Sequence, residues 1–292
     1  MKKINLSGMG VALITPFRAD GQVDFSALTR LVELHLTAGT DYLVVLGTTA
    51  ETPTLTLDEQ TRIVQAVVAQ VNKKRPIVVG LGGNNTAALV QRLKTEDFTG
   101  VDAILSVVPY YNKPSQEGIY QHYKALAEAS KLPLVLYNVP GRTGANMTAD
   151  TCLRLANACD SIVAVKEASG NTEQINRILT QKPEGFQVIS GDDGLALSLI
   201  ASGAVGVTSV LGNAFPKEFA QMVHLALEGN LKQAQPIHEG FSELTALLFA
   251  DGNPAGVKCL LAAMGYCENV LRLPLVPVQA AIEAKIHKQL HK

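Results

Sequence analysis

A lysine ends an apolar segment near the middle of the chain, and its position suits covalent chemistry. Lys166 closes the stretch 161–166, whose composition predicts a buried strand. Because side chains alternate along a strand, Ile162, Ala164 and Lys166 should share one face while Glu167 takes the other. An amine held on an apolar face without a carboxylate is driven towards its neutral form, which is the form that adds to carbonyl groups. Lys166 is therefore a candidate for Schiff-base formation, although a lysine at a strand end can equally extend into solvent.

Two residues at and after the end of the preceding apolar segment could act together with this amine. The stretch 132–137 ends in Tyr137, whose side chain should face inward by the same alternation. A phenol both donates and accepts hydrogen bonds, which suits proton transfer, whereas most buried tyrosines simply have a satisfied hydroxyl. Arg142 follows in a loop between Gly141 and Gly144, and its planar guanidinium could bind a carboxylate through two hydrogen bonds. Most loop arginines are only solvated, so both interpretations of Arg142 remain open.

A turn at 47–49 is the third candidate. Gly47, Thr48 and Thr49 follow the apolar stretch 41–46 and offer backbone N–H groups and two hydroxyls. Such a turn can hold a small carboxylate without a full counter-charge. Threonines in loops more often serve as turn or capping residues, so the turn alone is a weak signal.

The segments that must position these residues alternate regularly along the chain. Apolar runs rich in Val, Ile and Leu predict strands covered on both faces, at 9–14, 41–46, 76–80, 102–108, 132–137, 161–166, 186–189 and 204–209. Helical periodicity predicts helices at 26–38, 58–72, 86–98, 116–130, 148–158, 172–182, 192–201 and 215–229. Thr56 and Glu59 predict a capping box at the start of the second helix.

Eight strand–helix units predict an α/β fold of the closed (β/α)8 type, a TIM barrel, over residues 1–229. An open, doubly wound sheet is the competing architecture. Residues 230–292 show helical patterns without a strand candidate, so we expect a C-terminal helical extension packed on the barrel. Active sites of such barrels lie at the carboxyl ends of the strands, where the three candidate positions would meet.

The composition limits the partners and the location of the protein. The chain has 25 basic and 26 acidic residues and lacks the basic excess of a nucleic-acid-binding protein. No apolar run approaches the ~20 residues that cross a bilayer, and the apolar stretch 9–14 is too short for a signal sequence. The four cysteines show no C-x-x-C spacing, which indicates reduced thiols. We therefore expect a cytoplasmic protein without nucleic-acid or membrane partners.

Several other site types are disfavoured. Residues 80–85 lack the last glycine of a dinucleotide fingerprint, and neither a P-loop lysine motif nor a G-x-S-x-G elbow occurs. The six histidines show no metal-ligand spacing, which argues against a metal-dependent barrel aldolase.

Taken together, the strand ends resemble the dihydrodipicolinate synthase / N-acetylneuraminate lyase family of class I pyruvate aldolases. The resemblance runs from Ala12 to Pro274 and is carried by the motifs GTTAE, PYYNKPSQEGIYQHY, LYNVPGRTG, VKEASGN and SGDD, and by the Asn253-Pro254 stretch before Lys258. Arg142 in PGRTG resembles the synthase branch, which condenses pyruvate with L-aspartate 4-semialdehyde on the pathway to diaminopimelate and lysine. A sialic acid lyase or a 2-keto-3-deoxy sugar acid aldolase is the alternative.

The resemblance implies catalytic roles for four residues. Lys166 would form an imine with pyruvate, and Tyr137 would act as the acid and base beside it. Thr49 would link Tyr137 by hydrogen bonds to Tyr111, which in this family comes from the neighbouring subunit. The expected assembly is a homotetramer built as a dimer of dimers.

The resemblance also implies how the substrates bind. The backbone amides of Thr48 and Thr49 would hold the carboxylate of pyruvate, while Gly191 and Thr208 line the same pocket. Arg142 would hold the carboxylate of the semialdehyde. No metal or organic cofactor is expected, because the lysine itself serves as the electron sink.

Three residues depart from the family pattern or lack a role in it. Ala50 stands where glycine is customary in the GTTGE turn, so a positive φ at this position would be costly. Lys258 and Arg272 near the C-terminus are expected to be no more than solvated or structural charges.

The feedback site for L-lysine is also altered. Relatives that are sensitive to lysine often carry histidine and glutamate where this chain has Leu57, Gln60 and Ala88. Asn84 and Tyr110 remain, but the acidic partner of the lysine ammonium is missing. The sequence therefore predicts weak or absent inhibition by L-lysine.

Overall fold

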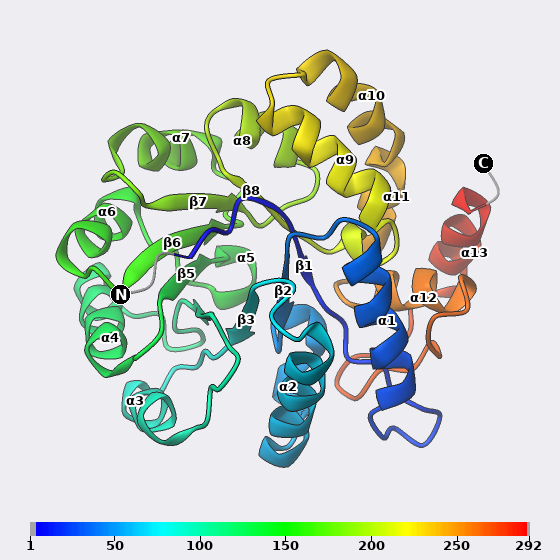
Figure 1. The fold of residues 1–292 in the computed structure, drawn as a ribbon, viewed down its shortest axis with the longest axis horizontal. Coiled ribbons are helices and arrows are strands. Elements are labelled where there is room, and N and C mark those ends of the chain that lie inside the picture. Colours follow the sequence, from blue (N-terminus) through cyan, green and yellow to red (C-terminus); the bar gives the residue numbers. More distant parts are fainter. Residues whose placement is uncertain (1–3, 291–292) are drawn as a thin grey trace.

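The computed structural model describes residues 4–290. Residues 1–3 of the predicted barrel and residues 291–292 of the predicted C-terminal extension lie outside this range. Its parallel strands form one closed barrel, in which each strand pairs with the next and β8 pairs with β1 (Figure 1). The strands are β1 (Gly8–Ala12), β2 (Tyr42–Val45), β3 (Ile77–Gly80), β4 (Ala103–Val107), β5 (Leu134–Asn138), β6 (Ile162–Glu167), β7 (Gln187–Ser190) and β8 (Gly206–Ser209). The predicted (β/α)8 barrel is confirmed, and the open sheet is excluded.

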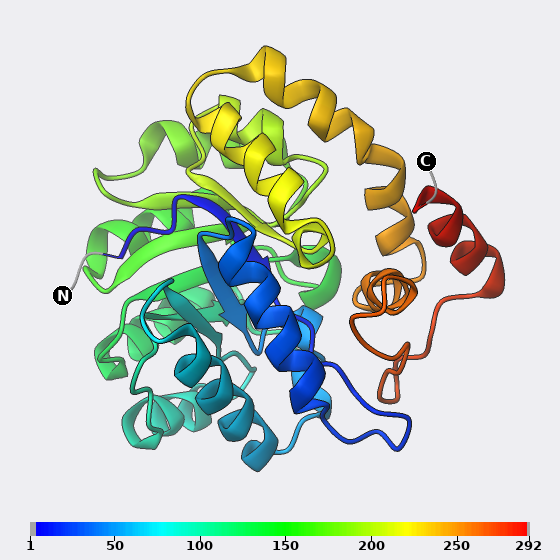
Figure 2. The ribbon, with the colours of Figure 1, turned by 45° about the vertical axis from the view of Figure 1, so that its right-hand side comes forward.

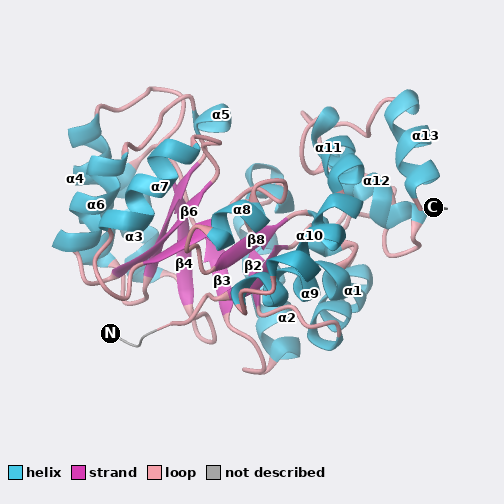
Figure 3. Ribbon diagram, turned by 90° about the horizontal axis from the view of Figure 1, so that it is seen from above, coloured by secondary structure: helices cyan, strands magenta, loops and turns pink. Residues whose placement is uncertain are grey.

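Helices surround the strands, as the view from above shows (Figure 3). Those that follow successive strands are α1 (Phe25–Thr37), α2 (Leu57–Val71), α3 (Thr86–Thr95), α4 (Gln116–Ala129), α6 (Ala149–Ala158), α7 (Thr172–Gln181), α8 (Ala196–Ala201) and α9 (Pro216–Leu227). Short helical turns lie in the loops at η1 (Thr48–Ala50), η2 (Thr52–Thr54), α5 (Pro140–Thr143) and η3 (Leu211–Asn213). The capping box of α2 is confirmed, because the side chains of Thr56 and Glu59 each accept a hydrogen bond from the other's backbone N–H.

The strands are buried on both faces, as their composition predicted. Inward side chains fill the bore with a small apolar cluster that includes Tyr42, Val44, Leu105, Val135 and Ala164. Outward side chains pack against the helices in a larger cluster. The bore is therefore a packed core, and ligands must bind above it.

One predicted side-chain direction is wrong. Ile162 packs in the outer cluster and not in the bore, whereas Ala164 lies in the bore as expected. The pairing of β5 with β6 shifts register here, because Leu134 pairs with Ile162 and Val135 pairs with Ala164. A bulge of this kind adds one residue and breaks the simple alternation of faces. The alternation resumes after it, so Lys166 still faces inward.

Helix α8 begins later than predicted, at residue 196 and not at 192. The cause is Asp193, whose buried Oδ2 accepts hydrogen bonds from the backbone N–H groups of Val210 (3.0 Å) and Leu211 (2.9 Å). A carboxylate that joins the ends of β7 and β8 keeps its own residue in a turn. The SGDD segment therefore belongs to the loops above the barrel.

The C-terminal extension consists of α10 (Leu231–Gly240), α11 (Ser242–Ala250), α12 (Ala255–Ala263) and α13 (Ala280–Gln289). It lies beside α1 and α9 in both views of the ribbon (Figures 1 and 2). One apolar cluster joins Leu31 of α1 and Phe219 of α9 to Leu248 and Leu260 of the extension. The extension thus shares its core with the barrel, and a boundary at residue 229 stays a prediction. Within residues 4–290, none of the helices is long and apolar enough to cross a membrane.

Candidate active site

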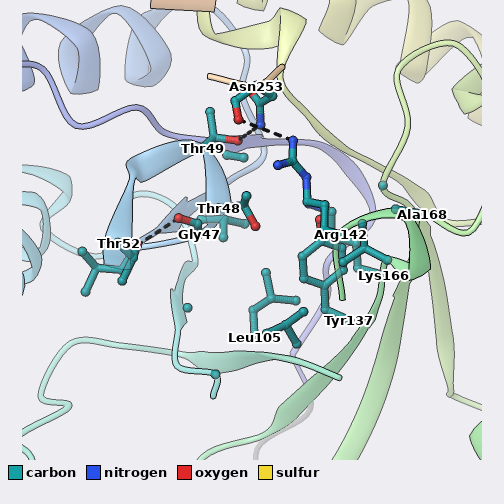
Figure 4. Close-up of a pocket in the computed structure, with 18 of the residues that line it drawn as sticks. Gly47, Thr48, Thr49, Thr52, Leu105, Tyr137, Arg142, Lys166, Ala168 and Asn253 are labelled. Atoms are coloured by element: carbon teal, nitrogen blue, oxygen red, sulfur yellow. Dashed lines mark hydrogen bonds between the residues drawn. The ribbon is translucent and has the colours of Figure 1, made fainter. Parts of the chain in front are cut away.

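A cavity of about 560 Å³ opens at the carboxyl ends of the strands (Figure 4). Its size is typical of a small-molecule site. The residues that line it come from all eight strands or the loops that follow them, and from the extension; they include Gly47, Thr48, Thr49, Tyr137, Arg142, Lys166, Gly191 and Asn253. The structure therefore brings most of the predicted site residues together.

Lys166 and Tyr137 lie side by side at the mouth of the bore. They are paired across β5 and β6, and the Lys166 Nζ is 4.4 Å from the centroid of the Tyr137 ring. Both side chains are almost fully buried, with 6% and 7% of their surface exposed, yet both line the cavity. The alternative in which Lys166 extends into bulk solvent is excluded. An amine in this position can reach a carbonyl group in the cavity.

Glu167 points to the opposite face of β6, as predicted. Its Oε1 accepts a hydrogen bond of 2.8 Å from the Asn138 side chain and a longer one from Gln174. Burial raises the pKa of the Glu167 carboxyl, and the hydrogen bonds from Ser169, Asn138 and Gln174 oppose this shift. This carboxylate is held behind the barrel wall, so it does not pair with the amine of Lys166.

The turn η1 lines the cavity across from Lys166 and Tyr137 (Figure 4). Gly47 and Thr48 line the cavity, and the Thr52 hydroxyl donates to the carbonyl oxygen of Gly47 at 2.9 Å. Thr49 is buried, and its Oγ1 accepts a hydrogen bond of 2.9 Å from the Asn253 side chain. The turn is thereby fixed from both ends.

Asn253 is a site residue that the sequence did not assign. Its backbone carbonyl accepts a hydrogen bond of 3.4 Å from the Arg142 guanidinium, so Asn253 lies between Arg142 and Thr49 (Figure 4). Its buried Oδ1 has no hydrogen-bond partner among the described residues, although a buried amide oxygen normally has one. The motif around Asn253 and Pro254 was visible in the sequence, but neither spacing nor residue type indicated that it reaches the barrel mouth.

Arg142 lies at the rim of the cavity. Pro140 begins the single helical turn α5, and Arg142 is an exposed residue of that turn. Among residues 4–290, the guanidinium has one hydrogen-bond partner, the Asn253 carbonyl. Its remaining donors are available to an anionic ligand.

Gly191 lies directly beside the amine. An added Cβ would be 2.8 Å from the Cβ of Ala168, 3.0 Å from the Cε of Lys166 and 3.1 Å from the carbonyl oxygen of Glu167. The Gly191 N–H donates to that same Glu167 oxygen at 2.7 Å, which holds the backbone of Gly191 in place beside Lys166. Only glycine leaves the lysine side chain undisturbed.

Gly191→Ala is therefore expected to slow imine formation by between about 10- and 100-fold, because it displaces Lys166 from its position. The rate of reductive trapping with pyruvate measures the effect directly. Gly240→Ala is the matched control, since an added Cβ there meets nothing within 4 Å. An unchanged trapping rate in a folded Gly191→Ala protein would contradict the prediction.

Two predicted site residues do not line this cavity. The Tyr111 side chain is 87% exposed and lies outside the cavity of its own chain. Thr208 is buried in β8, where its hydroxyl pairs with the Tyr42 hydroxyl at 2.8 Å. Thr208 is therefore not among the residues that line this cavity, and its role in the pocket stays a prediction.

The comparison with known proteins is decisive for the family. The model of the dihydrodipicolinate synthetase family matches residues 5–292. This chain belongs to that family. It is therefore an enzyme of the kind that the strand-end motifs indicated.

Relatives of known name and structure agree over the whole chain. The 4-hydroxy-tetrahydrodipicolinate synthase of Parabacteroides distasonis is 61% identical over 292 residues, which is 100% of this chain and 98% of the relative. The crystal structure of dihydrodipicolinate synthase from Aquifex aeolicus superposes with a TM-score of 0.94 at 40% identity, covering 98% of this chain and 97% of that one. A structure described as the first monomeric dihydrodipicolinate synthase variant gives 0.95 at 38% identity, covering 98% and 96%. These relatives support the synthase activity over the alternative aldolases.

The alanine that departs from the family turn is accommodated without strain. Ala50 is buried and is not among the described residues with positive φ, whereas Glu51 takes the left-handed conformation at φ 54°. The Ala50 carbonyl accepts a hydrogen bond of 2.8 Å from the Thr15 hydroxyl. The expected cost of the extra methyl therefore does not arise at this position.

Lys258 was expected to be a solvated or a structural charge, and the structure excludes the solvated one. Its side chain is fully buried, and its Nζ donates to the Glu51 carboxylate, whose side chain is also fully buried. Burial lowers the pKa of Lys258, and Glu51 opposes this shift. Arg272 is the structural charge that was expected, with a two-pronged ion pair to Glu59.

Proposed function

We propose that this chain condenses pyruvate with L-aspartate 4-semialdehyde through an imine on Lys166. The observation that carries the proposal is the Lys166 amine beside the Tyr137 ring, in a cavity whose opposite wall is the Thr48–Thr49 turn and whose rim holds Arg142. The names of the relatives agree with this activity. The substrates are small keto and aldehyde acids, which fit the size and the polar groups of the cavity.

In the first half of the reaction, the neutral amine of Lys166 adds to the ketone carbon of pyruvate. The resulting carbinolamine loses its hydroxyl as water and becomes an imine, and each proton movement requires a donor and an acceptor beside the nitrogen. The Tyr137 hydroxyl can serve as both. Backbone N–H groups of Thr48 and Thr49 hold the carboxylate of the keto acid, as oriented amides hold anions elsewhere.

In the second half, loss of a methyl proton converts the imine to an enamine, whose carbon attacks the aldehyde of the second substrate. Arg142 binds the carboxylate of that substrate at the rim of the cavity. The amine of the condensed product then attacks the imine carbon, which closes the ring and releases Lys166. The reaction thus proceeds without a metal or an organic cofactor, because the iminium nitrogen stabilises the developing charge.

The assembly is part of the proposal. The exposed Tyr111 has a left-handed backbone conformation at φ 76°, which is rare for a bulky residue and is typical of functional positions. Its sequence neighbour Tyr110 and Leu57 at the start of α2 are also large, exposed side chains. We propose that the partner subunit's Tyr111 completes the proton path through Thr49, in a homotetramer arranged as a dimer of dimers. A cytoplasmic location belongs to the same proposal.

Two assays test the reaction. Borohydride treatment with pyruvate should add the reduced keto acid to Lys166, which peptide mass spectrometry would locate. A coupled assay with both substrates should then show condensation. Cleavage of a sugar acid or of sialic acid, without condensation, would instead favour another aldolase of the family.

L-lysine is expected to inhibit this enzyme weakly or not at all. Leu57 and Ala88 are exposed and offer no charge, while Gln60 already accepts a hydrogen bond of 3.1 Å from the Arg92 guanidinium. Arg92 is itself paired with Glu96, so these positions offer a lysine ammonium no free carboxylate. A steady-state titration measures the inhibition, and half-inhibition at micromolar lysine would refute the prediction.

A further inference from the structure

The C-terminal extension reaches the back of the cavity wall through a buried ion pair. Lys258 lies on α12, and its Nζ donates to Glu51 Oε1 at 2.5 Å and to the Val270 carbonyl oxygen at 2.9 Å. The other oxygen of Glu51 accepts from the Arg272 backbone N–H at 3.0 Å. Two fully buried charges are costly to desolvate and often add little net stability. Stability alone is therefore a poor explanation for this pair.

Glu51, the acidic partner of Lys258, lies at the end of the turn η1, which lines the cavity. Glu51 follows η1 and has left-handed φ and ψ angles of 54° and 34°. Its backbone N–H donates to the Thr48 carbonyl at 3.1 Å, which closes the turn. A left-handed conformation of a residue other than glycine persists when surrounding contacts impose it. Here the contacts come from Lys258 and Arg272.

The side chains of Arg272 and Asn253, also in the extension, contact the segment from Thr48 to Thr54. The Arg272 guanidinium donates to the Thr54 carbonyl at 2.9 Å, at the end of η2. Asn253 donates to the Thr49 hydroxyl. The Lys258 Nζ and the Arg272 guanidinium carbon also lie over the Phe17 ring, at 4.0 and 4.5 Å from its centroid. The segment from Thr48 to Thr54 is thus fixed at three points by residues that follow the barrel.

We propose that the ion pair of Lys258 and Glu51 is a positioning device, which holds the Thr48–Thr49 amides where they bind the carboxylate of the keto acid. The inference rests on the proposed function. Neither charged residue is among those that line the cavity, so both act through the turn and not on the substrate. Hydrogen bonds from backbone amides weaken steeply when the geometry is lost, so a loosened turn should bind pyruvate less well.

The test is the double variant Glu51→Gln/Lys258→Met, which leaves no unpaired buried charge and so favours folding. The KM for pyruvate is expected to rise at least about tenfold while kcat at saturating pyruvate changes little. This pattern indicates the loss of binding energy that substrate and transition state share. The KM for the semialdehyde should stay close to that of the unmodified enzyme. Glu51→Gln alone, which keeps the shape of the side chain, should shift the pyruvate KM in the same direction.

Ile286→Ala is the matched control, because it removes a fully buried side chain of α13 without touching the turn. It should lower the melting temperature but leave the pyruvate KM unchanged. The inference is overturned if the pyruvate KM is unchanged in a folded Glu51 variant, or rises equally in Ile286→Ala. It is also overturned if both Glu51 variants fail to fold, since the pair would then serve stability. If the unmodified enzyme traps no pyruvate on Lys166, the proposed function fails and this inference falls with it.

Discussion

Lys166→Ala is expected to abolish both condensation and the reductive trapping of pyruvate. The amine is the group that forms the covalent bond with pyruvate, and an apolar cluster fills the bore beneath it. Loss of a nucleophile from a covalent mechanism lowers kcat by roughly 10⁴-fold or more. The coupled assay measures the loss of turnover, and mass spectrometry after borohydride treatment measures the loss of the adduct.

Lys131→Ala provides the control for a lysine change that leaves the site intact. Lys131 is exposed in the loop before the amino end of β5 and is not among the residues that line the cavity, so trapping and turnover should stay at the level of the unmodified enzyme. The melting temperature of Lys166→Ala should remain close to normal, because the variant removes an amine from an otherwise apolar wall. Turnover retained in a folded Lys166→Ala protein would exclude the Schiff-base mechanism.

The sequence predicted the barrel well because its strands are buried on both faces. Continuous runs of Val, Ile and Leu leave few other positions for a strand, and the eight predicted strands overlap the observed ones. The errors occur where tertiary contacts overrule local pattern. The bulge in β6 depends on its pairing with β5, and the late start of α8 depends on the contacts of Asp193 with the end of β8.

The site was predictable only where strand ends supply the residue. Lys166, Tyr137 and the turn at Thr48 follow from the rule that barrel sites lie at the carboxyl ends of strands. Asn253 and Lys258 escaped that rule because they reach the site from a helical extension that has no strand. Their partners Thr49 and Glu51 are about two hundred residues earlier, a separation that periodicity does not register.

These long-range contacts change the meaning of the extension. A helical segment that only covers the barrel flank could vary without effect on catalysis. The extension of this chain instead shares a core with α9 and contributes three residues that fix the wall of the cavity. Barrel and extension therefore form one functional unit, in which the barrel supplies the reactive groups and the extension holds one of its loops.

Arg142→Ala is expected to lower kcat/KM for the semialdehyde while leaving pyruvate trapping nearly intact. The guanidinium lies at the rim of the cavity, and its weak contact with the Asn253 carbonyl at 3.4 Å is the protein hydrogen bond that the variant removes. A charge-assisted hydrogen bond contributes roughly 1.5–3 kcal/mol, which corresponds to a loss of about 10- to 100-fold. The second substrate loses the anchor of its carboxylate, whereas the keto acid is held by the Thr48–Thr49 turn.

Arg142→Lys separates charge from geometry. It keeps the positive charge but loses the planar fork, so its kcat/KM for the semialdehyde should lie between those of Arg142→Ala and the unmodified enzyme. Pyruvate trapping rates are measured in parallel on all three proteins. An equal loss of trapping in Arg142→Ala would make the arginine a structural support of the Asn253 contact, and an unchanged semialdehyde kcat/KM would remove it from substrate binding. If only kcat/KM for the semialdehyde falls, and falls less in Arg142→Lys than in Arg142→Ala, the choice of the second substrate is assigned to this one side chain.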